Sequence, residues 1–325
     1  MISSLRFFPV RSLRTCATAN RHATTLHARN NQEMQLPDGR KLGYSEHGRV
    51  SDYPLLFMHG YPASRLETLG IDDTARRHNL RIITPDRNGF GLTTFDPSRR
   101  IVDWPGDVRA LVQHLNIKRF AVLGGSGGSP YALACAYRLP PTMLSGVGIM
   151  GGAGPCEAGS HHMSLPYRVS AMAAHHWPAS YRVLWNTLLW AFRHLLASPS
   201  GAQWIDSKLE SHIGKQDDMT TEERRGVIAR LVFEAFRQGT EPVVHDARLL
   251  TSSWEIPFED VTNKVMIWHG TKDSNAPVQM IRYLAERLPL CTLQEFEEDT
   301  HFTLSRRMDE ILAELVPEQS RVMEL

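Results

Sequence analysis

Short apolar runs alternate with segments of helical period along most of the chain after residue 33. Short apolar runs of this kind are typical of buried strands. Such runs lie at residues 40–48, 54–60, 80–86, 120–126, 144–150, 264–270 and 292–298. Helical period appears at residues 64–78, 103–115, 128–139, 278–288 and 308–316. We expect the first run to be one arm of an opening hairpin and the other six to form one sheet. The alternation predicts an α/β fold with a mostly parallel sheet flanked by helices.

This alternation of strand and helix patterns is absent between residue 154 and about residue 250, where long helical segments replace the strands. Residues 158–205 contain no Asp or Glu but hold four tryptophans, at positions 177, 185, 190 and 204. An inserted segment of this composition is expected to form a lid over an apolar pocket, the alternative being that each tryptophan only packs the segment on the core. We therefore expect a core of residues 33–153 and 251–325, interrupted by a helical lid at residues 154–250.

The net charge of +1 hides an uneven distribution of charged residues. The first 32 residues hold five arginines and no acid, which leaves 31 basic against 35 acidic residues in the rest of the chain. A slightly acidic body argues against a nucleic-acid partner. An acid-free leader rich in Arg and Ser is typical of a mitochondrial transit peptide. We expect residues 1–32 to be such a targeting segment, or else a disordered tail of a cytoplasmic protein.

Membrane spans, disulfide frameworks and metal sites are not indicated. The nearest approach to a membrane span, residues 183–197, is interrupted by Asn186, Arg193 and His194. The four cysteines are scattered without a CxxC pair, which argues against a disulfide framework and a zinc site. Two pairs of adjacent histidines, at 161–162 and 175–176, do not point together on a helix. We expect no metal and no cofactor.

The stretch "FAVLGGSGGSP", residues 120–130, places four glycines and a serine directly after an apolar run. A phosphate loop would need a lysine after its last glycine, and none follows Gly128. The glycine pattern at residues 146–151 precedes no clear helix and has no acid in 158–205 to hold a ribose. The remaining interpretation is Gly-x-Ser-x-Gly, in which Gly124 and Gly128 permit a sharp strand-to-helix turn. Ser126 is therefore the candidate nucleophile.

A serine hydroxyl needs a histidine to take its proton and a carboxylate to orient that histidine. Asp273 lies three residues beyond the run at 264–270, and His301 follows the next predicted strand. Both positions are loops at the carboxyl edge of a parallel sheet, in the chain order Ser, acid, His. Asp246 is the alternative acid, whereas Asp299 is too close to His301 in sequence to orient it.

The negative oxygen formed during acyl transfer requires two preorganised donors, which are usually backbone N–H groups. The amide of Gly127, next to Ser126 at the start of a helix, is one candidate. The amide of Tyr61, which follows His59 and Gly60 after an earlier strand, is the other.

These motifs together resemble the α/β-hydrolase superfamily, in particular its lidded group of esterases, epoxide hydrolases and haloperoxidase-like enzymes. The resemblance rests on "HGYP" (59–62), "DRNGFG" (86–91), "GGSGG" (124–128), "HGTKD" (269–273) and His301, and covers about residues 35–315. It implies the α/β-hydrolase fold with an inserted lid. It also implies that Asp86 and Arg87 have structural roles, bonding the loop behind the site.

Three positions depart from the family pattern. Gly125 stands where the family often has an aromatic residue or histidine, and is expected to leave more room or mobility there. Thr300 replaces the glycine that commonly precedes the histidine, and Asn88 replaces a proline.

The resemblance and the residues together predict a serine carboxylesterase that forms an acyl-enzyme from small to medium, uncharged, apolar esters, with no cofactor. A carbon–carbon bond hydrolase or a cofactor-free haloperoxidase could use the same three residues. A catalytically silent ligand-binding protein is the alternative from another class. We call the turn at residues 124–128 the elbow. Epoxide hydrolases carry an aspartate at its central position, so Ser126 argues against alkyl-enzyme chemistry. The sequence does not indicate an oligomeric state.

Overall fold

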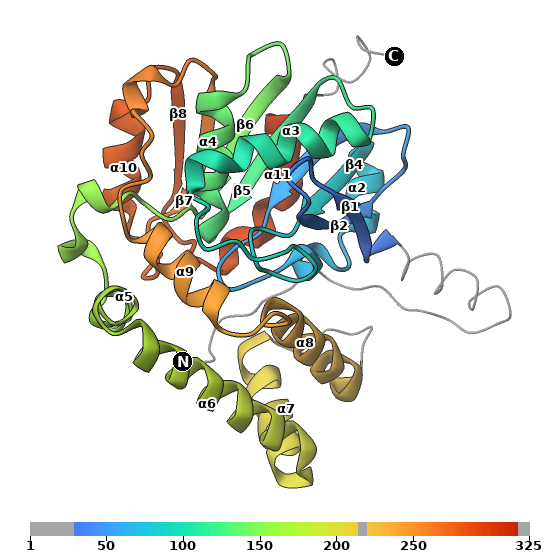
Figure 1. Cartoon of the computed structure of the whole chain (residues 1–325), viewed down its shortest axis with the longest axis vertical. Helices are drawn as coiled ribbons and strands as arrows, with labels where there is room; N and C mark the ends of the chain where they lie inside the picture. Colours follow the sequence, from blue (N-terminus) through green and yellow to red (C-terminus); the bar gives the residue numbers. More distant parts are fainter. Residues whose placement is uncertain (1–28, 214–219, 318–325) are drawn as a thin grey trace, which may run out of the picture.

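The computed structural model describes residues 29–213 and 220–317, which form one eight-stranded sheet with helices around it (Figure 1). The strands are β1 (Gln32–Gln35), β2 (Lys41–His47), β3 (Tyr53–Met58), β4 (Leu80–Pro85), β5 (Phe120–Gly125), β6 (Leu144–Met150), β7 (Val265–Gly270) and β8 (Cys291–Phe296). Their order is β1-β2-β4-β3-β5-β6-β7-β8. β1 pairs antiparallel with β2, and β2 pairs antiparallel with β4. The strands β3 to β8 all run parallel to one another. The predicted α/β class is confirmed.

The N-terminal edge of the sheet begins earlier than expected. β1 starts at Gln32, and the Arg29 guanidinium donates a hydrogen bond of 2.8 Å to the Gly48 carbonyl. Residues 29–32 therefore belong to the folded core, although the sequence boundary was expected at residue 33. The rest of the expected targeting segment lies outside the described residues.

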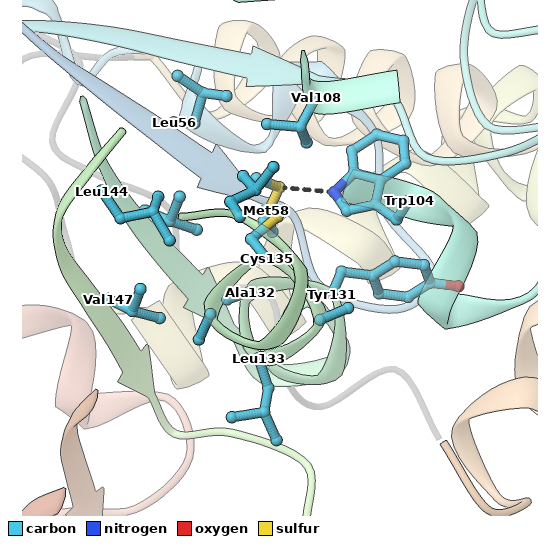
Figure 2. Close-up of a cluster of buried hydrophobic side chains, with 14 of the residues drawn as sticks. Leu56, Met58, Trp104, Val108, Tyr131, Ala132, Leu133, Cys135, Leu144 and Val147 are labelled. Carbon is cyan, nitrogen blue, oxygen red and sulfur yellow. Dashed lines mark hydrogen bonds between the residues drawn. The ribbon is translucent and has the colours of Figure 1, made fainter. Parts of the chain in front are cut away.

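Two helical layers cover the two faces of the sheet. The alternating side chains of β3 show the division, because Leu56 and Met58 belong to one apolar cluster and Leu55 and Phe57 to the other. Figure 2 shows the first cluster, in which Met58 packs among side chains of α3 (Trp104–His114) and α4 (Ser129–Arg138) and accepts a 3.3 Å hydrogen bond from the Trp104 indole. Helices α2 (Asp72–Arg77) and α11 (Met308–Leu315) contribute to the second cluster, and α10 (Val278–Arg287) to the first.

The helix expected at residues 64–78 is broken in two. A 3₁₀ turn, η1 (Arg65–Thr68), is separated from α2 by Gly70, whose φ is +94°. Glycine adopts this conformation without steric cost, and an α-helix cannot pass through it. The break separates Glu67, in η1, from the helix that follows.

Among the residues that the structure describes, five α-helices lie between β6 and β7: α5 (Leu165–His176), α6 (Pro178–Ala197), α7 (Pro199–Ile213), α8 (Thr221–Ala235) and α9 (Glu241–Leu250). Figure 1 shows α5, α6 and α7 along one edge of the molecule, with α9 and α8 between them and the sheet. None of the helices in residues 29–213 and 220–317 has the length and apolar character needed to cross a membrane.

Candidate active site

Ser126 lies in the turn between β5 and α4 with φ +50°, the only residue of the glycine-rich stretch with a left-handed backbone. A side chain in this region strains the backbone, and such strain persists only where the surrounding structure imposes it. The two flanking glycines show what imposes it. A Cβ at Gly124 would lie 2.7 Å from the Gly128 carbonyl oxygen, and a Cβ at Gly128 would lie 2.0 Å from that of Met58. The predicted steric requirement for glycine at both positions is confirmed.

The expectation that Gly125 leaves extra room is wrong. A Cβ at this position would approach the Phe57 ring to 3.1 Å. The side chain that fills this space therefore comes from the neighbouring strand β3 and not from the residue before the serine.

The structure brings Ser126, His301 and Asp273 together into one hydrogen-bonded series. His301 Nε2 lies 3.0 Å from Ser126 Oγ, and His301 Nδ1 lies 2.7 Å from Asp273 Oδ2. A carboxylate only accepts hydrogen bonds, so Nδ1 carries the proton and Nε2 is left to accept from the serine hydroxyl. This tautomer is the one that a general base for Ser126 requires.

Asp273 is held rigidly behind His301. Its Oδ1 accepts hydrogen bonds of 2.8 Å from the amides of Asn275 and Ala276, and its side chain is inaccessible to solvent. A buried neighbour, His269, donates from Nε2 to the Ala276 carbonyl at 2.7 Å, and burial lowers its pKa. His269 Nε2 also lies 3.7 Å from Asp273 Oδ2, but its hydrogen bond goes to the Ala276 carbonyl, so the ring supports the loop that carries Asp273.

Asp246, the alternative acid, has other partners. Both of its carboxylate oxygens lie 2.8 Å from Arg87 Nη1, and Oδ1 also accepts from the Tyr131 hydroxyl. The pair is fully buried and joins α9 to the loop after β4. Arg87 also donates to the Gly60 carbonyl at 2.8 Å, which is the kind of structural contact expected of it. Asp273, and not Asp246, is therefore the carboxylate placed against His301.

Asp86 is buried in a network of the same kind. It accepts hydrogen bonds from the backbone and guanidinium of Arg65, at 2.6 and 2.9 Å, and from the Leu92 amide. Burial nevertheless raises the pKa of Asp86 to about 6. Asn88 pairs with both backbone groups of Asp96, so the asparagine that replaces the family proline closes the same loop through hydrogen bonds.

The backbones of Tyr61 and Gly127, the two expected oxyanion donors, lie beside each other. A Cβ on Gly127 would lie 2.7 Å from Tyr61 Cβ and 3.2 Å from Tyr61 N. The loop before Tyr61 is tied down by His59, whose Nδ1 donates to the Gly60 carbonyl and whose Nε2 accepts from the Arg87 amide, both at 3.0 Å. Burial lowers the pKa of His59 well below its usual range, which keeps the ring neutral and able to accept.

Glu67 is a member of this site that the sequence did not reveal. Its Oε2 accepts a 2.6 Å hydrogen bond from the Gly60 amide. A side chain on Gly60 would meet Ser126 Cβ at 3.2 Å and the Glu67 carboxylate at 3.5 Å, so the two residues lie on the same side of Gly60. Burial raises the pKa of Glu67 to about 6, against the opposing effects of the Gly60 hydrogen bond, Arg87 and His301. In the sequence this glutamate is one polar position in a helical pattern.

Asp299 and Thr300 hold the loop that carries His301. Thr303 donates its hydroxyl to Asp299 and accepts from the Thr300 amide, both at 2.8 Å, and Arg307 adds a 3.1 Å contact to Asp299. Asp299 therefore stabilises the loop and does not contact the His301 ring, as its sequence position suggested.

Side chains of the inserted helices lie next to the site. Leu250, at the end of α9, would lie 3.1 Å from a Cβ on Gly127. Tyr61 packs in a cluster with Tyr181 and Trp185 of α6, and Tyr167 of α5 lies close enough to Asp273 for that charge, after burial, to raise its pKa. Apolar and aromatic side chains thus approach Ser126 from the inserted segment.

The tryptophans of this segment do not all take part. Trp185 faces inward and stacks near Phe236 with ring centroids 5.2 Å apart. Trp177 and Trp190, in contrast, are 58% and 61% exposed, and Trp204 is also exposed. Of Trp177, Trp185 and Trp190, at least some of which were expected to face the core, only Trp185 does so. Trp190 is exposed because it lies five positions after Trp185, which places it on the opposite side of α6.

In the described part of the chain, no group of three or more His, Cys, Asp or Glu side chains is arranged to hold a metal ion. The adjacent rings of His161 and His162 lie with centroids 3.9 Å apart, and His175 is hydrogen-bonded to Thr251. Cys135, Cys156 and Cys291 are free thiols.

Comparison with known proteins places the chain in a family. Residues 53–305 match the family described as alpha/beta hydrolase fold. The chain belongs to this family.

Individual relatives do not identify the substrate of this hydrolase, because they match only part of the chain or share only its fold. A proline iminopeptidase of Xanthomonas citri is 32% identical over 112 residues, which are 32% of this chain and 34% of that protein. A soluble epoxide hydrolase of Corynebacterium sp. is 32% identical over 105 residues, which are 31% of this chain and 34% of that protein. The chain thus spans about a third of the length of the curated relatives it matches. Among solved structures, an esterase of Exiguobacterium antarcticum superimposes with a TM-score of 0.61 and 17% identity, over 88% of this chain and 98% of the esterase. That likeness shows the fold, and the family shows a hydrolase.

Proposed function

We propose that this hydrolase is a serine carboxylesterase in which Ser126 is the nucleophile, His301 the general base and then acid, and Asp273 the residue that orients the imidazole. The observation that carries the proposal is the series Asp273–His301–Ser126, with contacts of 2.7 and 3.0 Å, on a serine held at φ +50°. A half-buried hydroxyl on a strained backbone, next to a correctly protonated histidine, is the arrangement that acyl transfer needs.

The chemistry proceeds in two halves. Ser126 Oγ attacks the ester carbonyl while His301 Nε2 takes its proton, and the amides of Tyr61 and Gly127 stabilise the negative oxygen. The imidazolium then protonates the departing alcohol, which leaves an acyl-Ser126. Water deprotonated by His301 releases the acid and restores Ser126. Asp273, buried and doubly bound by backbone amides, stabilises the imidazolium in both halves.

We further propose that residues 154–250 act as the lid over this site. Leu250, Tyr181 and Trp185 bring apolar and aromatic surface next to Tyr61 and Gly127, which favours uncharged, moderately apolar acyl groups. No cofactor enters any step.

The test is labelling by a fluorophosphonate probe together with hydrolysis of p-nitrophenyl acetate and butyrate. Ser126→Ala should lose labelling and at least about 10³-fold of kcat. Ser207→Ala, an exposed serine of α7, is the matched control and should keep both. Undiminished labelling of the Ser126→Ala protein would contradict the assignment, and a wild-type chain without labelling or turnover would favour a silent ligand-binding protein.

A second candidate, an aminopeptidase, is favoured by Glu67. A half-buried carboxylate on the Ser126 side of Gly60 could pair with the ammonium group of a substrate, and a matched relative is named proline iminopeptidase. If so, proline p-nitroanilide is cleaved faster than p-nitrophenyl acetate, and Glu67→Gln raises KM for the anilide but not for the acetate. An esterase without anilide turnover excludes this candidate.

Epoxide opening through an alkyl-enzyme is not proposed, because Ser126 occupies the position where that chemistry uses an aspartate. Styrene oxide turnover that survives Ser126→Ala would overturn this exclusion. A carbon–carbon bond hydrolase or a perhydrolase would use the same three residues, and the products formed from a vinylogous diketone, or from acetate with hydrogen peroxide, distinguish them from an esterase.

A further inference from the structure

The exposed apolar side chains of this protein are concentrated on one part of it. In the described part of the chain twelve large apolar side chains are exposed, and ten of them lie between residues 165 and 204, on or next to α5, α6 and α7. The other two are Val50 and Leu290. Monomeric soluble proteins rarely gather exposed apolar residues in this way unless the surface has a partner. We call this the α5–α7 surface: Leu165, Tyr167, Val169, Met172, Trp177, Val183, Leu184, Leu188, Trp190 and Trp204.

The helical spacing of these residues forms stripes. On α5, Leu165, Val169 and Met172 follow one another at intervals of four and three positions and so share one face, which is the exposed one, while Ala174 faces inward. On α6, Val183 and Trp190 are seven positions apart and share a face, with Trp185 turned inward. The apolar stripes therefore point outward, opposite to the usual orientation of an amphipathic helix on a core.

The charge of the same segment has one sign. Residues 158–205 contain Arg168, Arg182 and Arg193 and no Asp or Glu. All three arginines are exposed, although Arg182 lies 3.8 Å from Glu241. The nearest carboxylate after the segment, Asp206, is paired with Arg225 at 2.6 Å. The body of the chain after residue 32 has more acids than bases, so residues 158–205 are a local positive exception.

We propose that the α5–α7 surface docks the protein on an anionic lipid surface. Exposed tryptophan, leucine and valine on α5 and α6, two helices that carry arginine and no acid, are the combination that lies in the headgroup region of a bilayer. A second copy of the chain is a poorer occupant, because placing the acid-free helices α5 and α6 on their own copies opposes arginine to arginine. Figure 1 shows α5, α6 and α7 at the outer edge of the molecule, where a flat surface can reach them together.

Docking there would bring the candidate active site to the lipid. Helix α6 exposes Val183 and Trp190 on one side, while its Tyr181 and Trp185 pack in a cluster with Tyr61 of the site. The docking surface itself does not depend on the proposed esterase, and its test is done on a protein that cannot turn over.

The experiment is co-sedimentation of the full Ser126→Ala chain with vesicles of phosphatidylcholine, alone or mixed with phosphatidylglycerol. The anionic vesicles should bind the protein at least about tenfold more strongly than the neutral ones. Adding Trp177→Ser and Trp190→Ser should weaken binding to the anionic vesicles by at least about tenfold. Arg168→Gln with Arg193→Gln should remove most of the difference between the two kinds of vesicle.

Leu290→Ser is the matched control, since it removes an exposed apolar side chain outside the α5–α7 surface, and its binding should equal that of the parent. Circular dichroism verifies that each variant is folded. Failure to bind anionic vesicles overturns the proposal. So does equal loss in the Leu290→Ser control, or a dimer in light scattering that Trp177→Ser and Trp190→Ser dissociate while no vesicle binds.

Discussion

The elbow around Ser126 and the inserted helices α5 to α7 follow opposite rules of construction. At the elbow each atom is constrained, because a methyl group on Gly124 or Gly128 would overlap backbone atoms. On α5 to α7 the large side chains face solvent, and the described residues leave much of their surface without a partner. The difference shows which contacts determine the sequence of each region. The elbow is determined by contacts inside the fold, whereas the outer helices are shaped for contacts outside it.

The largest expected effect separates the two buried aspartates. Asp273→Asn places an amide donor against His301 Nδ1, which forces the proton onto Nε2 and removes the base, so kcat for p-nitrophenyl acetate should fall about 10⁴-fold. Asp246→Asn should instead lower stability by about 3–5 kcal/mol, because Arg87 is left buried without its counter-ion. Urea unfolding and kcat measured on both variants distinguish these outcomes. A variant pair with the opposite pattern would make Asp246 the orienting acid.

The rigidity of the elbow can be tested by one methyl group. Gly128→Ala puts a Cβ 2.0 Å from the Met58 carbonyl oxygen and should cost about 3 kcal/mol or more of unfolding free energy. Gly106→Ala, in α3, has no atom within 4 Å of the new Cβ and should gain about 0.5–1 kcal/mol. Equal effects in urea titrations would mean that the elbow can relax around an added side chain.

Two tryptophans of α6 provide the corresponding test for the inserted helices. Trp185→Ala removes a ring packed against Tyr181 and Phe236 and should lower stability by about 2–4 kcal/mol. It should also shift the preferred acyl length while acetate turnover stays within several-fold. Trp190→Ala should change stability by less than about 0.5 kcal/mol, since the ring is exposed. If Trp190→Ala shifts the acyl preference and Trp185→Ala does not, the assignment of inner and outer faces is wrong.

The sequence predicted the elements whose patterns are local. Strand runs, the order of Ser126, Asp273 and His301, and the need for glycine at 124 and 128 follow from periodicity, topology and sterics. It did not predict contacts between distant residues, such as the pair of Arg87 and Asp246, which are 159 positions apart. Nor did it show which side of α6 faces the core, because tryptophans occur on both sides. Glu67 escaped notice because its role depends on the turn at Gly70, which separates it from the helix pattern.

The smallest expected effect concerns Glu67, whose carboxyl belongs to the tightly constrained region. Its pKa rises from 4.5 to about 6 on folding, because burial disfavours the charged form. The folded state therefore binds more protons than the unfolded state between these values, so this group lowers stability as the pH rises through that window. Glu67→Gln removes the titration and keeps an oxygen for the Gly60 amide.

The unfolding free energy of wild type relative to Glu67→Gln should fall by about 2 kcal/mol between pH 4 and pH 7. Urea titrations at both pH values measure it, with the exposed Glu259→Gln as the control for losing one charge. A difference that stays constant with pH, or that grows as the pH rises, would show that the Gly60 hydrogen bond outweighs burial and that the carboxylate is a stabilising member of the site.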